Sequence, residues 1–153
     1  TFHLFPIIRL ADILLLYAEA MNAAYGPDAD PKGYGLTAKA AVQRVRTRAG
    51  FKSDDQYLTS VTTQEQMLEK IKNERRIELA FEEQRYFDLR RWMEGDKLNQ
   101  PVTGIRIEEA AGNLNYSYFV VDGQRKFDPK MYLHPIPLDE MKISPNLVQN
   151  PGW

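Results

Sequence analysis

The sequence predicts a mainly α-helical protein built from helical hairpins, with a small β-hairpin or an irregular excursion near the C-terminus. Three observations lead to this fold class. Apolar residues recur at helical spacing over most of the chain up to Met93. Helix-capping residues stand where the periodic stretches begin, and glycines stand where they end. The period-two alternation of a β-strand replaces the helical pattern only beyond Gly95.

Composition and charge exclude several classes of protein. With 153 residues, 43% hydrophobic and 27% charged, the chain is long enough for one domain with a buried core. Its 20 Lys and Arg against 21 Asp and Glu leave a net charge of -1 without a long basic run, so nucleic acid is not an expected partner. The absence of cysteine excludes disulfides and thiolate metal sites. The chain begins without an initiator Met or a leader, and we expect it to be part of a longer protein.

The first predicted helix runs from Ile7 to Ala24 and should be buried on most of its circumference. Its few polar residues fall near one side of the helical period: Arg9, Asp12, Glu19 and Asn22. Three charges in this stretch argue against a membrane span.

A loop and a second helix follow, and together with the first helix they predict an αα-hairpin of tetratricopeptide-like size. The loop, residues 25–35, is rich in Gly and Pro. Its Asp28 and Asp30 are not part of the ordered series of oxygen ligands that a calcium-binding loop needs. We therefore expect them to stabilise a turn. Thr37 is the predicted N-cap of a helix that runs to about Ala49.

A third, longer helix is predicted from the capping box of Thr63 and Gln66 to Trp92 or Met93. At 3.6 residues per turn, one row of this helix would combine charged and aromatic residues: Glu74, Glu78, Phe81, Arg85, Asp88 and Trp92. A mixed row of this kind indicates partly buried charges that neutralise one another.

Two interpretations of the charged row remain open. On one, two acids a helical turn apart serve as acid and base in glycoside hydrolysis. The favoured alternative is an ion-pair network in which Arg85 bridges Asp88 and a preceding Glu, because an arginine within reach of both acids lowers their pKa values. On this interpretation Arg85→Met destabilises the fold strongly, whereas Arg90→Met, on another side of the helix, is nearly neutral.

The C-terminal third predicts two short strands and an extended segment. The strands are residues 102–107 and 116–121, and the prolines of residues 132–137 keep that segment out of a helix. Tyr116 and Tyr118 share one side of the second strand and are candidate ligand-stacking residues. Packing against the helices is the favoured alternative for both rings. His3 and His134 have no acidic neighbour at ligand spacing, so no metal or cofactor is expected.

Four ordered blocks of sequence resemble the SusD/RagB family. Residues 5–20 (FPIIRLADILLLYAEA) resemble its Arg-Leu-Ala-acidic run before Tyr-Ala-Glu-Ala. Residues 42–50 (VQRVRTRAG) and 74–92 (ERRIELAFEEQRYFDLRRW) are similar to two further motifs, with Glu83 in place of a usual Gly. The fourth block comprises residues 133–137 (LHPIP) with the closing QNPGW, which ends in Trp153 where Tyr is common.

The resemblance implies that residues 1–153 are the C-terminal part of a surface-exposed outer-membrane lipoprotein of Bacteroidetes. Members of the family bind glycans or other nutrients without cleaving them, and present them to a SusC-like TonB-dependent transporter. The lipid anchor and much of the ligand site would then lie outside this chain. A structural module that contacts the transporter and has no ligand site of its own is the alternative function.

Overall fold

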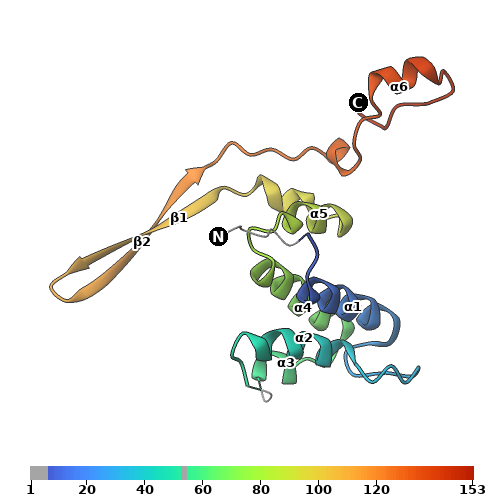
Figure 1. Cartoon of the computed structure of the whole chain (residues 1–153). Coiled ribbons are helices and arrows are strands. Elements are labelled where there is room, and N and C mark those ends of the chain that lie inside the picture. The colour runs from blue at the N-terminus through green and yellow to red at the C-terminus, as the bar shows by residue number, and fades with distance from the viewer. Residues whose placement is uncertain (1–6, 53–54) are drawn as a thin grey trace, which may run out of the picture. The chain divides into compact units, whose positions relative to one another are not determined.

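The computed structural model describes residues 7–52 and 55–153, and Figure 1 shows the order of their helices and strands. The chain divides into two compact units, Thr1–Arg85 and Tyr86–Trp153, which are described separately. The first unit contains α1 (Leu10–Tyr25), α2 (Ala38–Arg48), α3 (Gln56–Thr59) and α4 (Gln64–Glu78). Next come α5 (Gln84–Arg91), a 3-10 turn (Gly95–Asn99), β1 (Val102–Ala110), β2 (Asn113–Asp122), a second 3-10 turn (Pro129–Tyr132) and α6 (Leu138–Ile143). The predicted mainly α fold class with a small β-hairpin is confirmed.

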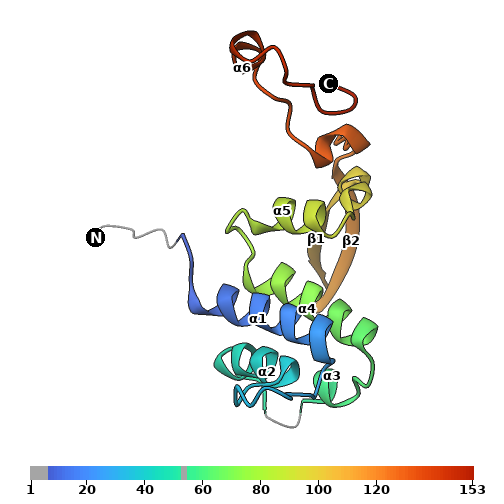
Figure 2. The ribbon, with the colours of Figure 1, turned by 90° about the vertical axis from the view of Figure 1, so that its right-hand side faces the viewer.

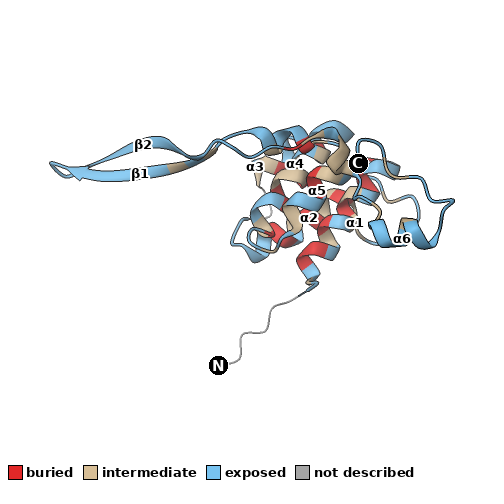
Figure 3. Cartoon of the chain, turned by 90° about the horizontal axis from the view of Figure 1, so that it is seen from above, coloured by how far each residue is buried: buried red, intermediate tan, exposed pale blue. Residues whose placement is uncertain are grey.

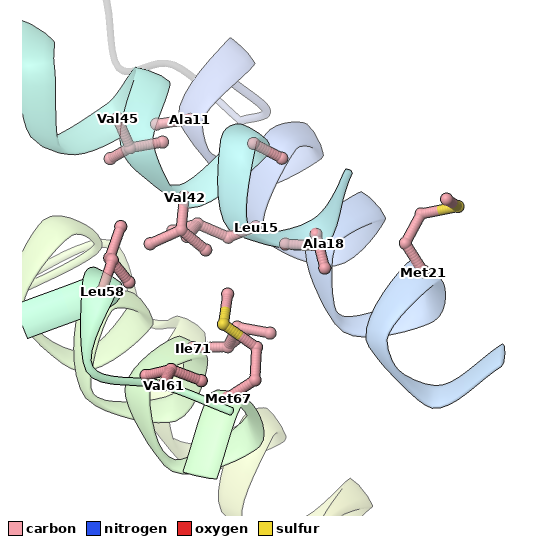
Figure 4. Close-up of a cluster of buried hydrophobic side chains, with 12 residues drawn as sticks. Ala11, Leu15, Ala18, Met21, Val42, Val45, Leu58, Val61, Met67 and Ile71 are labelled. Carbon is pink, nitrogen blue, oxygen red and sulfur yellow. The ribbon is translucent and has the colours of Figure 1, made fainter. Parts of the chain in front are cut away.

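The core of the first unit lies where α1 packs against α2 and α4 (Figures 2 and 4). Small side chains on α1 and α2, such as Ala18 and Ala41, let the helices approach closely, and larger ones fill the space between them. The fully buried large residues are Leu15, Leu58, Met67, Ile71, Val42 and Val45. Each contributes about 1.5–3 kcal/mol relative to an exposed side chain. The predicted packing of the first two helices is confirmed.

The prediction that the first helix is buried on most of its circumference is wrong, and two of its polar residues are among those that are buried. Asp12 and Asn22 are buried, whereas Leu10 and Ile13 are exposed. Asn22 Nδ2 donates to the Gln64 carbonyl at 2.9 Å, and Gln64 Nε2 donates to the Asn22 carbonyl at 2.7 Å. Buried polar groups on α1 therefore serve to attach α4, which periodicity alone does not reveal.

Both predicted helix caps are present. The Thr37 hydroxyl accepts the Ala40 N–H at 3.1 Å, and Thr63 with Gln66 forms a complete capping box. In the connecting loop, the Asp30 carboxylate accepts the N–H groups of Tyr34 and Gly35, which confirms its role in a turn.

The prediction of one continuous third helix is wrong, because α4 ends at Glu78 and α5 begins at Gln84. In a continued helix the Glu78 carbonyl would accept the N–H of Glu82. Here Arg9 Nη2 donates to that carbonyl, and the Glu82 N–H turns to Leu79 O at 3.2 Å. Phe81 and Glu83 both adopt left-handed backbone, with φ of 65° and 62°. The predicted row of six residues is therefore divided between two helices.

The second unit has a small cluster of its own around Phe127. The Phe127 and Tyr132 rings meet edge to face at 4.8 Å, and Gly95 N–H donates to the Tyr132 hydroxyl at 2.8 Å. A Cβ at Gly95 would lie 2.2 Å from the Phe127 ring, so only glycine fits there. The closing residues fold back, with Trp153 Nε1 donating to Lys130 O at 3.0 Å.

The expectation that Arg90 tolerates replacement by Met is not supported by its contacts. Its Nη2 donates to Tyr132 O at 2.6 Å, and its Nη1 lies 2.7 Å from His134 Nε2. Arg90 therefore attaches the extended segment that contains His134 to α5. His3 lies outside the described residues.

We predict that Glu83→Gly keeps or raises the stability of the chain. A left-handed backbone costs a non-glycine residue about 1–2 kcal/mol, and replacement by glycine removes this cost. The greater flexibility of glycine in the unfolded chain offsets about half of that stabilisation. Glu69→Gly, within α4, is the matched control and should cost about 1 kcal/mol. Urea denaturation of both variants checks this. An equal loss of stability in the two variants would show that the left-handed turn is not a stable feature.

Candidate functional site

The two candidate tyrosines lie on one face of the β1–β2 hairpin. In the antiparallel register Tyr118 stands opposite Ile105, and Tyr116 stands opposite Ile107. Cross-strand partners share a face, so the four side chains form one apolar patch. The exposed fractions of Tyr116 and Tyr118 are 57% and 76%. The preference for packed rings is therefore wrong for this chain.

Among the described residues of the second unit, no other helix or strand packs extensively against the hairpin. Its two strands pair with each other, and Figure 3 shows them exposed along almost their whole length. Leu114 and Val120 extend the patch at its two ends, where they stand opposite Glu109 and Thr103. We call the six apolar and aromatic residues of this side the tyrosine face: Ile105, Ile107, Leu114, Tyr116, Tyr118 and Val120.

The opposite face of the hairpin has a different character. Arg106, Glu108 and Asn115 lie there, and Phe119 covers Gly104. The Arg106 guanidinium lies 5.7 Å from the Phe119 ring centre. Aromatic rings free to stack on a ligand are thus concentrated on the tyrosine face.

Carboxylates of the predicted charged row are paired with arginines from α1 and α2. Glu74 accepts from Arg46 at 2.8 Å, and Arg46 also pairs with Asp55 at 2.5 Å. The Arg46 guanidinium stacks on the rings of Phe51 and Tyr57, 4.1 and 4.3 Å from their centres. Burial lowers the Arg46 pKa, but hydrogen bonds to the two carboxylates outweigh it and the pKa is raised.

A second cluster joins α1 and α2 to the end of α4. Arg9 contacts the Glu78 carboxylate at 2.5 Å and the Glu82 carboxylate at 2.8 Å, and Arg48 contacts Glu78 at 2.6 Å. The hydrogen bond with Glu82 is the main reason that the Arg9 pKa is raised, against the effect of burial. Deeper in the unit, buried Arg75 pairs with buried Asp12 at 2.8 Å.

Carboxylates of the charged row form ion pairs, as predicted, but with partners that sequence spacing missed, and the predicted bridge by Arg85 stays a prediction. Glu74 and Glu78 are neutralised by residues 28 to 69 positions away, and Asp88 pairs with Arg91 at 2.9 Å. Long-range pairs of this kind leave no periodic signal in a sequence.

Neither a cluster of metal-ligating side chains nor a long apolar helix occurs in the part of the chain that the structure describes. There, no group of three His, Asp or Glu side chains is placed to hold a metal ion. In the same residues, no helix has both the length and the apolar character that a bilayer crossing needs.

Comparisons with known proteins agree with the resemblance in sequence. The SusD family matches residues 3–153. Two proteins of Formosa agariphila, SusD-like protein P2 and SusD-like protein P25, are 29% and 30% identical over 95% and 94% of the chain. The chain spans about a quarter of their length. The solved structure of selenomethionine BT4246 matches the whole chain at 30% identity and a TM-score of 0.76, over 25% of its own length.

We predict that Arg46→Met destabilises the first unit by about 3–5 kcal/mol, because Glu74 and Asp55 then keep their desolvation cost without a neutralising partner. Arg44→Met, an exposed position on the same helix, should stay within about 0.5 kcal/mol of the parent. Thermal or urea denaturation distinguishes the two. Equal denaturation midpoints of the two variants would contradict the structural role of the ion pairs that Arg46 makes.

The Asp55 carboxylate predicts an acid-sensitive contribution to stability. Burial alone would raise its pKa, but the Tyr57 N–H and the Arg46 guanidinium together hold the pKa below its usual value. A lowered folded-state pKa stabilises the protein above about pH 4, and this stabilisation is lost as the pH falls through the folded-state pKa. Asp55→Asn should therefore be less stable than the parent at pH 7, with a gap that closes on acidification. A stability difference between Asp55→Asn and the parent that does not change with pH would contradict this account.

Proposed function

Because the chain belongs to the SusD family, we propose that it forms part of a non-catalytic glycan- or nutrient-binding protein of an outer-membrane uptake system. The match of the family over residues 3–153 carries this proposal. The partner is a SusC-like TonB-dependent transporter, and a lipid anchor outside these residues holds the protein at the cell surface. No cofactor takes part in binding of this kind.

The tyrosine face is the proposed ligand contact within the chain. Sugar rings present apolar C–H faces that stack on aromatic side chains, and tyrosine adds a hydroxyl for hydrogen bonding. Tyr116 and Tyr118 combine both features on an exposed surface. Since the chain spans about a quarter of its relatives, this face is one contribution to a larger binding site.

Absence of catalysis is part of the same proposal. The carboxylates at the end of α4, Glu78 and Glu82, are engaged in ion pairs with Arg9 and Arg48. The proposed absence of catalysis would be overturned if the full-length protein released the aglycone of a chromogenic glycoside and Glu78→Gln abolished this activity.

The alternative is a module that contacts the transporter and has no ligand of its own. The observation that favours it is the apolar character of the tyrosine face, in which Ile105, Ile107, Leu114 and Val120 surround the two rings. Exposed apolar patches of this kind also mark protein interfaces.

We predict that Tyr116→Ala and Tyr118→Ala each weaken glycan binding by the full-length protein about tenfold, the effect of losing one aromatic contact of roughly 1.4 kcal/mol. Stability should change by less than about 0.5 kcal/mol, because both rings are exposed. Tyr34→Ala is the matched control, a tyrosine that is 61% exposed in the loop before α2. Calorimetric titration with glycans found to bind the parent provides the measurement.

The same variants separate the two functions. Weaker glycan binding with retained copurification of the transporter supports a ligand contact. Unchanged glycan affinity together with loss of transporter copurification would instead support the alternative function, a module that contacts the transporter.

A further inference from the structure

The two faces of the β1–β2 hairpin differ in electric charge. None of the six residues of the tyrosine face is charged, and of the two that stand opposite its ends, Thr103 is neutral and Glu109 is acidic. Arg106 is the one basic residue of positions 102–122, all of which the structure describes. Alternation along the strand places Arg106 on the opposite face, together with Glu108. The tyrosine face therefore has no basic side chain of the hairpin.

Arg106 makes its contact on the opposite face as well. Its guanidinium lies 5.7 Å from the centre of the Phe119 ring, which covers Gly104 on that face. The face of an aromatic ring attracts a cation at this distance. A ligand on the tyrosine face therefore has no cation of the hairpin with which to pair.

The lack of a cation separates two chemical classes of glycan. Chains with uronic acid or sulfate groups are polyanions, and proteins bind such groups mainly with arginine or lysine. A charged group that moves from water onto an apolar surface loses hydration, and on the tyrosine face it would gain no counter-charge. Glu109 adds repulsion at one end of the face. A neutral glycan has no charge to desolvate, and its C–H groups match apolar and aromatic side chains.

The tyrosine face also has a direction. Tyr116 and Tyr118 are two residues apart on β2, so their side chains are about 7 Å apart along the strand. The row from Leu114 to Val120 extends over about 20 Å. A single sugar ring stacks on one tyrosine, whereas a linear chain of rings that runs along β2 contacts both. The geometry thus favours an oligosaccharide over a free monosaccharide.

We infer that the tyrosine face takes a neutral, linear glycan chain, which lies along β2 and stacks on both Tyr116 and Tyr118. Glycans with uronic acid or sulfate groups are excluded from this contact. The inference rests on the proposed function of the tyrosine face as a ligand contact, and it names the class of glycan that this contact takes.

Affinity electrophoresis of the full-length protein tests the class of glycan. The gels contain a neutral polysaccharide (mixed-linkage β-glucan, arabinoxylan or galactomannan) or an anionic one (polygalacturonate, alginate or a sulfated galactan). We expect at least one neutral polymer to retard the protein, with an affinity that Tyr116→Ala and Tyr118→Ala each reduce about tenfold. Neither substitution should change the affinity for an anionic polymer.

The outcomes of this experiment distinguish the inference from the proposed function. Binding of an anionic polymer that depends on the tyrosines would overturn the inference and leave the proposed ligand contact in place. If no polymer binds in a way that depends on the tyrosines, the proposed ligand contact falls, and the inference falls with it.

Chain length tests the direction of the bound glycan. The probes are a monosaccharide and a hexasaccharide prepared from the neutral polymer that binds. We expect the hexasaccharide to bind the full-length protein at least about tenfold more tightly, since it reaches a second ring. Equal affinities would show that one sugar ring makes the whole contact, and would contradict a chain that lies along β2.

A lysine added to either face of the hairpin tests whether charge sets the selectivity. Glu109→Lys places a cation beside the tyrosine face, and Glu108→Lys places the same cation on the opposite face, one residue away. Both substitutions change the net charge of the full-length protein equally. We expect Glu109→Lys to raise the affinity for polygalacturonate at least about threefold above that of Glu108→Lys, by a contact that salt screens. An equal response of the two variants, whether a gain or none, would contradict the inference.

Discussion

The guanidinium of Arg9 determines how the first unit is joined. Standing at the N-cap of α1, it binds the Glu78 carbonyl, the Glu78 carboxylate and the Glu82 carboxylate. One side chain therefore ends α4, holds the following turn and attaches both to α1. Glu78 also binds Arg48, so its carboxylate joins the end of α4 to α2 as well. The left-handed turn after α4 accompanies this arrangement, in which the Glu78 carbonyl accepts from the Arg9 guanidinium and the Glu82 N–H donates to Leu79 instead.

Apolar packing and ion pairs have different roles in this unit. The core is formed by alanines and medium-sized aliphatic side chains, which bring α1, α2 and α4 together but fit many relative positions of the helices. The arginine–carboxylate pairs are directional. Asp12 with Arg75 and Arg46 with Glu74 each require one particular alignment of their helices. Buried charge of this kind costs desolvation energy, and we infer that it acts here by selecting a single packing.

Local features of the fold were predictable from the sequence, and long-range ones were not. Thr37 and Thr63 identified two helix starts, because capping depends on residues three positions apart. The break after Glu78 was missed; Arg9 binds the Glu78 carbonyl there from 69 residues earlier in the chain, and a contact of that range leaves no periodic pattern. One local signal was present: Glu83 stands where the related motif usually has Gly, and the structure gives it a left-handed backbone. Exposure of Tyr118 could not be predicted, because alternation in a strand does not say which face is covered.

The role of Arg9 is tested most directly by the backbone of residues 79–83 in an Arg9→Met variant. Carbon chemical shifts of these residues, measured by NMR, report the conformation of each one separately. With Arg9 removed, the Glu78 carbonyl becomes free to accept the Glu82 N–H, so we expect the shifts of Phe81 and Glu83 to move toward helical values. Shifts unchanged from the parent would show that another interaction ends α4, and would contradict this account.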